Sequence, residues 1–433
     1  MKHHHRIAIS LAALAGGTVV AASAQAQAFY LQEQAARGAG RAFSGEAADT
    51  GAASLWWNPA AIAGMDKAEA TVSASAILPK GDVVDTGTVI GRPGGTFAPV
   101  GGSSRSRNPI NNGVLPSGAV AIPLGDRLAV GLAVTSPYSF TTDYDADSWA
   151  RYSADRTYLR TFDIQPSAAV AVTDWLRVGG AVNVEHVEAS LGNALPNLSA
   201  ALPDGNQTLK GDGWDVGWTA GFQMHNDWAT VGVSYKSAIK HTLKGDLTVS
   251  GLLGPLAGQN RKLSGVEASF YTPAQIMIGG RFRATDKLTL NAQTIRYTWE
   301  KFDAIRLGAP INAALPENYR SIWSYAAGLD YAVSPRVTVR AGAQRTLTPT
   351  RDGERDARVP DSNRWNYAVG GSFDVTPNFS LDAAANYVDF EETTIDRRTA
   401  AYAGSKVETP ILVNGRLENA RAIVLSLGGR FRF

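Results

Sequence analysis

Apolar and polar residues alternate with a period of two in many short stretches of this chain. In residues 127–134, Leu128, Val130, Leu132 and Val134 occupy one parity, whereas small or basic residues occupy the other. A period of two predicts β-strands whose two faces meet different surroundings. The same pattern recurs in residues 176–185, 336–344, 379–387 and 421–433.

Short and long connections follow one another between these predicted strands. The short ones have turn chemistry and lie at 125–126, 173–174, 226–227, 285–286, 334–335 and 376–378. The long ones lie at about 80–117, 138–157, 192–211, 250–262, 306–320, 348–362 and 394–419. Alternating loop lengths are typical of an up-and-down outer-membrane barrel with short periplasmic turns.

The pattern therefore predicts an all-β fold, a transmembrane antiparallel barrel of about fourteen strands with both chain ends on the periplasmic side. Past residue 28 no apolar run approaches the length that a spanning helix needs. A soluble β-sandwich is the alternative, but it does not require alternating loop lengths. We expect a multi-pass protein of the bacterial outer membrane, in contact with its lipids.

The last strand ends in an aromatic residue, Phe433. It must pair with the first strand, because an open sheet edge is not tolerated in lipid. A terminal aromatic residue resembles the signal by which outer-membrane barrels are recognised for insertion. The barrel-assembly machinery is therefore an expected partner.

Residues 1–26 have the features of a secretory signal peptide. Lys2 and Arg6 precede an apolar run and small residues in A-x-A spacing, so cleavage is expected after Ala26 or Ala28. The three histidines at positions 3–5 could be read as a metal site, but they lie in the segment that should be removed. The predicted division is signal peptide 1–26, N-terminal hatch 27–66 and barrel 67–433.

The predicted hatch fits neither the signal peptide nor a strand. Residues 29–65 have no sustained period, and glycines interrupt any helix in them. They include the run Trp56-Trp57-Asn58-Pro59-Ala60, in which two large rings precede a proline. Within a membrane barrel such a segment is expected to plug the lumen, which predicts a gated and selective pore.

Composition and motifs argue against other functions. The formal net charge of +2 and 18% charged residues provide no basic field for nucleic acid, and the chain has no cysteine for a disulfide framework. Outside the leader only His186, His225 and His241 remain, and their spacing predicts neither a metal site nor a catalytic motif. No cofactor is expected. A hydrolase or an adhesin stays as the alternative from another class.

Four prolines lie where a strand should be continuous: Pro123, Pro137, Pro166 and Pro273. Proline cannot donate to the ladder, so each marks either a break in the wall or a strand end. A gap that opens sideways would let an apolar molecule pass from the lumen into the bilayer.

The stretch AFYLQEQAARGAGRAFSGEAADTGAASLWWNPAAIAG resembles the hatch of the FadL family of outer-membrane channels for hydrophobic substrates. Similar stretches include SPYSFTTDYDADSWARYSADRTYLRTFDIQPSAAV, TPAQIMIGGRFRATDKLTLNAQ and VPDSNRWNYAVGGSFDVTPNFSLDAAANYV. This resemblance covers essentially the whole mature chain. It implies a fourteen-stranded barrel that takes up long-chain fatty acids or, in relatives, aromatic hydrocarbons, passively and with ligand-gated lateral release.

The resemblance also implies roles for particular residues. The hatch would be anchored by Asn58, Pro59 and Ala60, and the pocket that it closes would lie near Phe29, Tyr30 and Leu31. The third strand, about 127–137, would kink at Gly131 or Pro137. A carboxylate head needs a cation, and the candidates are Arg151, Arg156 and Arg364, each of which could instead form an ordinary surface salt bridge.

Overall fold

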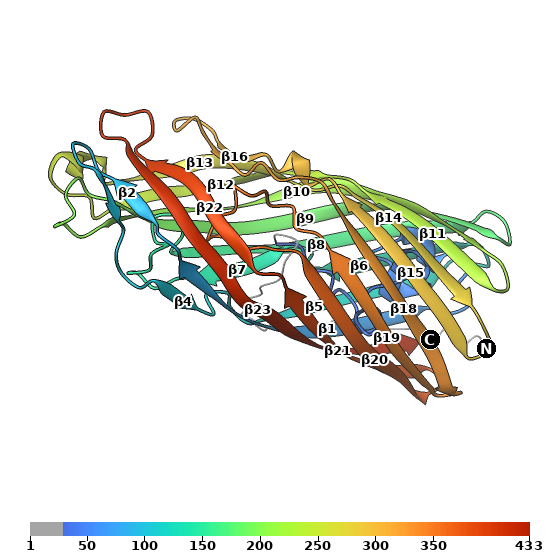
Figure 1. Ribbon diagram of the computed structural model, residues 1–433. Helices are drawn as coiled ribbons and strands as arrows, with labels where there is room; N and C mark the ends of the chain where they lie inside the picture. The colour runs from blue at the N-terminus through green and yellow to red at the C-terminus, as the bar shows by residue number, and fades with distance from the viewer. Residues whose placement is uncertain (1–28) are drawn as a thin grey trace.

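The computed structural model describes residues 29–433, and the predicted signal peptide lies outside the described residues. One antiparallel sheet closes on itself into a barrel (Figure 1). The first and last strands join it, with Glu69 opposite Arg432 at one end of their ladder. Following the ladders around the ring gives fourteen wall strands in the described part of the chain, as predicted.

Strands that continue one another across a short interruption count as one in this total. β7, β12 and β13 extend β6, β11 and β14 in this way. The wall strands are β1 Glu69–Asp85, β5 Gly113–Pro123, β6 Leu128–Thr135, β7 Ser139–Asp143, β8 Arg156–Ala171, β9 Leu176–Leu195, β10 Gly205–His225, β11 Ala229–Lys236, β12 Ile239–Ser250, β13 Arg261–Thr272, β14 Gln275–Arg283, β15 Leu288–Tyr297, β18 Ile322–Ser334, β19 Val337–Thr346, β20 Arg364–Thr376, β21 Phe379–Phe390 and β23 Thr409–Arg432.

The long connections contain further strands, where the sequence predicted only loops. These are β2 Val89–Gly91, β3 Phe97–Pro99, β4 Arg105–Arg107, β16 Ala304–Leu307, β17 Ala313–Pro316 and β22 Thr393–Ala401. Wall strands also run into the predicted loops, as β9 and β10 do between 192 and 211. The periodicity missed these parts because they lie in the long connections, where no lipid-facing row enforces alternation, although Ile90 of β2 and Ile395 of β22 are buried.

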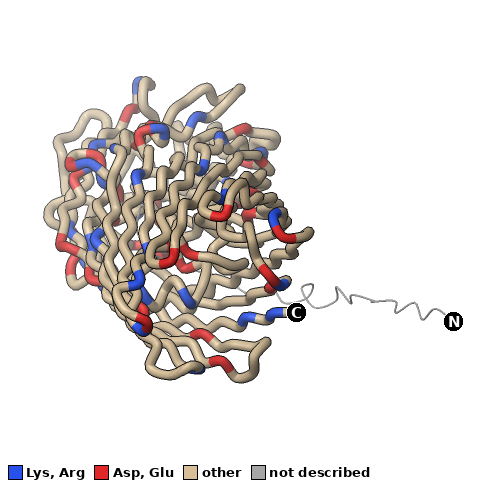
Figure 2. The backbone as a smooth tube through the Cα atoms, turned by 90° about the vertical axis from the view of Figure 1, so that its right-hand side faces the viewer, with Lys and Arg blue, Asp and Glu red and all other residues tan. Residues whose placement is uncertain are grey.

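The two ends of the barrel differ. All the long connections lie at one end in Figure 1, and the short turns lie at the other together with the C-terminus. Figure 2 looks onto the short-turn end and shows the strands closing into a ring with acidic and basic positions interspersed.

The outer face of the wall is apolar. In β6, Leu128, Val130 and Leu132 expose between 37% and 42% of their surface, whereas the inward Ala129 and Ala133 are buried. The other wall strands repeat this arrangement, so a band of exposed large apolar side chains surrounds the barrel. Such a band is what lipid requires of a barrel surface. No helix among the described residues is long and apolar enough to cross a membrane.

The N-terminal segment folds inside the barrel. It contains the short helix α1 Ala36–Ala39 and three single 3₁₀ turns, η1 Glu46–Ala48, η2 Ala52–Ser54 and η3 Pro59–Ile62; η4 Gly254–Gln259 and η5 Trp299–Lys301 belong to the long connections. Nearly every residue between Phe29 and Ala63 is buried. Its backbone lies against inward-facing glycines on opposite sides of the ring, among them Gly179, Gly232 and Gly342. Only glycine allows this close approach, so the segment fills the lumen.

Candidate functional site

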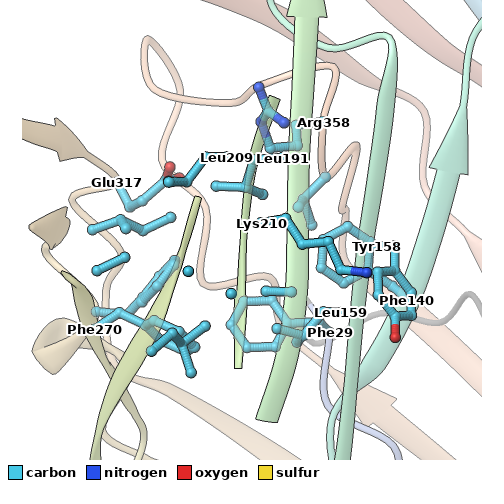
Figure 3. Close-up of a pocket in the computed structure, with 18 of the residues that line it drawn as sticks. Phe29, Phe140, Tyr158, Leu159, Leu191, Leu209, Lys210, Phe270, Glu317 and Arg358 are labelled. Atoms are coloured by element: carbon cyan, nitrogen blue, oxygen red, sulfur yellow. The ribbon is translucent and has the colours of Figure 1, made fainter. Parts of the chain in front are cut away.

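An apolar pocket lies in the lumen at the end with the long connections. Its walls come from Leu209 and Gly211 of β10, Leu243 of β12, Val266 and Phe270 of β13, and neighbouring loop residues. Figure 3 shows these side chains surrounding the cavity, with Glu317 and Arg358 on its upper side. The surface is apolar because these strands face the lumen with leucine, valine and phenylalanine in place of polar residues. It suits a hydrophobic ligand.

The pocket is narrow. Its free volume is about 70 Å³, whereas an apolar cavity of about 150 Å³ binds one benzene molecule. A long alkyl chain therefore fits only after a lining side chain moves.

Phe29, the first described residue, closes the inner side of this pocket. Its ring lies within an aromatic cluster, with centroids 5.0 Å from Trp299, 5.5 Å from Phe302 and 5.8 Å from Phe140. Edge-on and offset ring pairs of this kind contribute beyond their buried area. The hatch thus begins as part of the pocket wall.

The backbone next to Phe29 is bonded to the third wall strand. The carbonyl of Phe29 accepts a 2.9 Å hydrogen bond from the N–H of Ser139, and the N–H of Leu31 donates to the carbonyl of Pro137 at 2.7 Å. Tyr30 and Tyr138 form an antiparallel bridge between these two bonds. Three hatch residues therefore occupy the place of an edge strand.

Hatch residues 29–31 fill a gap in the barrel wall. β5 pairs with β6 from Pro123 up to Gly118, opposite Val134, and within the described chain residues 113–117 of β5 have no ladder partner on that side. The third strand is interrupted here, between Thr135 at the end of β6 and Ser139 at the start of β7.

Gln34 bridges the gap from the hatch side. Its side-chain nitrogen donates to the carbonyl of Ser136 at 3.1 Å, and its backbone carbonyl accepts from Ser117 Oγ at 2.7 Å. This gap between β5 and the β6–β7 interruption, filled by hatch residues 29–34, is called the Pro137 gap below.

The two kink candidates have different surroundings. The ladders on both sides of Gly131 are regular, and a Cβ there would lie 2.8 Å from Leu55 Cδ2 of the hatch. Pro137 lies in the interruption itself. The break in the strand is thus at Pro137, and Gly131 makes room for the hatch.

The Asn58-Pro59-Ala60 element fixes the hatch to the wall. The buried Asn58 amide donates to the carbonyls of Ala47 at 2.7 Å and Phe222 at 3.1 Å, and its oxygen accepts from the N–H of Ala60 at 3.0 Å. A Cβ on Gly179 would collide with the backbone of Pro59 and Ala60. Asn58 is therefore the cap of a 3₁₀ turn and a tie to β10 at once.

A buried charge cluster holds the body of the hatch. Arg41, which is fully buried, lies 2.5 Å from carboxylate oxygens of Glu46 and Asp49 and 3.5 Å from Asp330 on β18. Arg281 of β14 lies 2.7 Å from Asp330. Buried charges need such partners, because removing one leaves an uncompensated charge.

The three arginines proposed to bind a head group do not line the apolar pocket. Arg151 is bonded to Asp204 at 2.9 Å and to loop carbonyls. The side chain of Arg156 is 72% exposed, 3.9 Å from Asp143. Arg364 lies on β20 beside a separate small cavity that Tyr30 and Glu33 also line.

Leu31 packs against Ile77, Leu115 and Val388 of the wall.

Charged residues that the sequence did not single out do line the pocket: Lys210, Glu317, Asp356 and Arg358. Both terminal nitrogens of Arg358 are bonded to protein oxygens, at 2.8 Å to Thr157 Oγ1 and 2.5 Å to the carbonyl of Ser153. Three of these residues belong to loops distant in sequence, and no local pattern marks them. Among the described residues, no group of three or more His, Asp or Glu side chains could hold a metal ion.

Burial raises the pKa of Glu317 to about 7. Arg397 opposes this shift, with its Nη1 3.5 Å from Glu317 Oε2, and Asp356, 3.1 Å from the same nitrogen, adds to it. Arg397 thus forms ion pairs with two carboxylates that come from separate loops above the pocket.

Residues 17–433 match the family described as outer membrane protein transport protein (OMPP1/FadL/TodX). The chain belongs to this family. It is 23% identical to a long-chain fatty acid transport protein of Escherichia coli O6:H1, with 89% of this chain and 92% of that protein covered.

Solved structures share the fold. A Pseudomonas aeruginosa FadL homologue superposes with a TM-score of 0.81 at 23% identity, covering 94% of this chain and 99% of that one. The Ralstonia pickettii toluene transporter TbuX gives a TM-score of 0.65 at 18% identity, covering 92% and 97%.

Family membership confirms several predictions. The protein is a multi-pass barrel of the bacterial outer membrane and a transport protein for hydrophobic substrates, not an enzyme. The hydrolase alternative is thereby excluded. The end with long connections is the external one.

Proposed function

We propose that this protein takes up long-chain fatty acids or similar hydrophobic molecules across the outer membrane, passively, and releases them sideways into the bilayer. The proposal includes gating by the ligand. It has no covalent step, and the driving force is the transfer of apolar surface out of water.

One observation carries this proposal. Phe29 contributes its side chain to the pocket and its backbone carbonyl to the bond with Ser139 at the Pro137 gap. A cargo molecule that displaces the ring must therefore pull on the backbone that fills the wall gap. Binding in the pocket and opening of the wall are coupled through a single residue.

The opening would follow from the loss of few bonds. Displacement of residues 29–31 breaks the hydrogen bonds of Phe29 with Ser139 and of Leu31 with Pro137. Residues 113–117 of β5 then face the interruption of the third strand with Gln34 as the remaining bridge, through its bonds to Ser136 and Ser117. Backbone groups left unpaired in lipid are costly, so the gap stays closed by the hatch until cargo in the pocket displaces it.

The named relatives support two cargo classes. One is called a long-chain fatty acid transport protein and another a toluene transporter. Long apolar walls at Leu209, Leu243 and Val266 suit an alkyl chain. Aromatic hydrocarbons are the second candidate, because the donors of Arg358 are already bonded to the protein and Phe29, Phe140 and Phe270 offer ring faces.

Uptake into liposomes tests the proposal. Labelled oleate and labelled toluene are offered separately to vesicles with and without the reconstituted protein. Faster entry of oleate supports the first cargo class, and faster entry of toluene alone supports the second. If neither enters faster than in protein-free vesicles, the transport proposal fails.

A further inference from the structure

A second unpaired stretch interrupts the wall between β10 and its next neighbour. β10 pairs with β12 up to Asp212 opposite Lys244, and with β11 from Thr219 opposite Lys236 onward. Between these ladders, residues 213–218 have no ladder partner on this side in the part of the chain that the structure describes. The ladder from β10 to β9 runs through the same region without interruption. We call this stretch the β10 seam.

Few hydrogen bonds hold the β10 seam. Asp215 Oδ2 accepts from the N–H of Thr242 at 2.9 Å, and at the lower end Ser237 exchanges two bonds with the backbone of Trp218, at 2.9 and 3.0 Å. The carboxylate of Asp215 also lies 3.5 Å from His241 Nδ1. Irregular backbone at membrane depth persists only where it lines a cavity or is covered by protein.

The two strands overlap at the seam, and glycines permit the overlap. A Cβ on Gly213 would collide with the carbonyl of Thr242, and one on Gly217 would lie 2.7 Å from Ile239 Cγ1. β12 therefore covers the lumen side of β10 here. Asp215 is the one inward position between these two glycines that carries a side chain. Separating the strands requires the loss of the Asp215 bond to Thr242, its contact with His241 and the two bonds between Ser237 and Trp218.

The seam joins the pocket to the lipid face. Leu209 and Gly211 of β10 and Leu243 of β12 line the pocket directly above the seam. On the outer side, Trp214 and Val216 expose 58% and 66% of their surface in the lipid-facing band. Apolar surface thus lies above the seam in the lumen and outside it on the lipid face. The polar groups between these two surfaces are those of Asp215 and His241, whose Nε2 lies 3.4 Å from Glu185 Oε1, and a hydrocarbon that passes the seam must displace them.

We propose that the β10 seam is a second lateral portal, through which a hydrophobic cargo passes between the pocket and the bilayer, with Asp215 as its latch. This portal rests on the proposed function for its cargo, but it is separate from the Pro137 gap. The Pro137 gap is closed by the hatch, whereas the seam is closed by wall residues alone. The pocket would therefore have one exit under hatch control and one that opens by strand separation.

Cross-linking across the seam tests the portal. The chain has no cysteine, so Asp215→Cys with His241→Cys can be joined specifically by a short, reducible bis-thiol reagent. Oleate uptake by the cross-linked protein should fall by about half or more and recover on reduction, since one of two exits is closed. Thr208→Cys with Thr248→Cys, opposite one another in the intact ladder, is the matched control and should leave uptake unchanged when cross-linked.

The outcomes separate the two proposals. If the fully cross-linked seam variant takes up oleate as fast as its reduced form, the portal is overturned. Oleate uptake by the reduced form in that case still supports the transport function. If the unmodified protein does not accelerate oleate entry at all, both proposals fail.

A second measurement needs no substitution. A fatty acid with a photoreactive alkyl chain, activated in vesicles, should label residues 213–218 and 239–243 more than the regular β19–β20 wall. Equal labelling of seam and regular wall would overturn the portal.

Discussion

The backbone N–H of Leu31 donates a 2.7 Å hydrogen bond to the carbonyl of Pro137. Leu31 belongs to the segment inside the barrel, and Pro137 interrupts a strand of its wall. This bond and its neighbour between Ser139 and Phe29 make the plug part of the wall at one place. We therefore expect access to the pocket and integrity of the wall to depend on one another.

Removal of the plug should open the lumen to water. Deletion of residues 29–65 leaves the inward Asp330 without its partner Arg41, and Arg281 without its partner Asp49. We expect faster leakage of small polar dyes from vesicles with the shortened protein. Leakage equal to that of the full chain would mean that the segment does not seal the lumen.

Gly179 and Gly180 form a matched pair for testing hatch contact. A side chain on Gly179 would collide with Pro59 and Ala60, whereas one on Gly180 meets nothing closer than Thr219 O at 3.9 Å. Gly179→Val should displace the hatch and raise dye leakage. Gly180→Val, with the same gain in volume one residue away, should not. Equal leakage from both variants would contradict the observed seating of the hatch.

Asn58 should contribute more to hatch stability than an exposed asparagine. Asn58→Ala removes three buried hydrogen bonds and leaves the carbonyls of Ala47 and Phe222 with fewer donors. The expected loss is about 2–4 kcal/mol of local stability, measured as faster hydrogen exchange of amides in residues 45–62. Asn206→Ala, which loses two exposed bonds, to Asp155 and Thr208, is the control. Similar exchange in both variants would show that the tie to β10 is unimportant.

The two external loops that carry Glu317 and Asp356 above the pocket should become less stable as pH rises toward neutrality. The pKa of Glu317 is about 7 in the folded protein against 4.5 in an exposed chain, so the folded loops favour the protonated carboxyl. The contribution of Glu317 to stability is then fully present below pH 4.5 and is lost as pH rises through about 7, by up to about 3 kcal/mol in all. The pKa of the neighbouring Asp356 is lowered, against its burial, chiefly by Arg397 and Arg358, so its own contribution is lost only at lower pH, below its ordinary range.

Limited proteolysis of the external loops at several pH values measures this effect. Glu317→Gln should remove the dependence, because the amide does not titrate. The control Glu408→Gln, at an exposed position, should keep the pH dependence of proteolysis. A pH dependence that survives in Glu317→Gln would assign the effect to another group.

The sequence predicted the barrel because lipid imposes a strict pattern on it. Every lipid-facing position of a strand such as β6 must be apolar, so Leu128, Val130 and Leu132 reveal the strand and its orientation. The strand count followed from the alternating short and long connections, and the closure between the first and last strands followed from the need to remove an open edge in lipid. The additional strands β2–β4, β16, β17 and β22 belong to the long connections outside the lipid, where no such constraint acts.

The pocket could be predicted only in part. Phe29 was expected near it from the likeness of the hatch, and it lines the pocket. Glu317, Asp356 and Arg358 come from two loops and reach the pocket only through tertiary packing, so no sequence spacing connects them. The proposed head-group residues were chosen by charge alone. Arg151 illustrates the weakness of that choice, since its guanidinium is bonded to Asp204 and to loop carbonyls.

The most direct test of the central claim measures two fluxes through one preparation. Vesicles containing the full-length protein are loaded to report both labelled oleate and a small polar dye. Coupling between pocket and plug predicts that oleate crosses faster than in protein-free vesicles while the dye does not. Accelerated passage of the dye together with oleate would contradict a plugged, selective channel, and no acceleration of oleate would contradict hydrophobic transport itself.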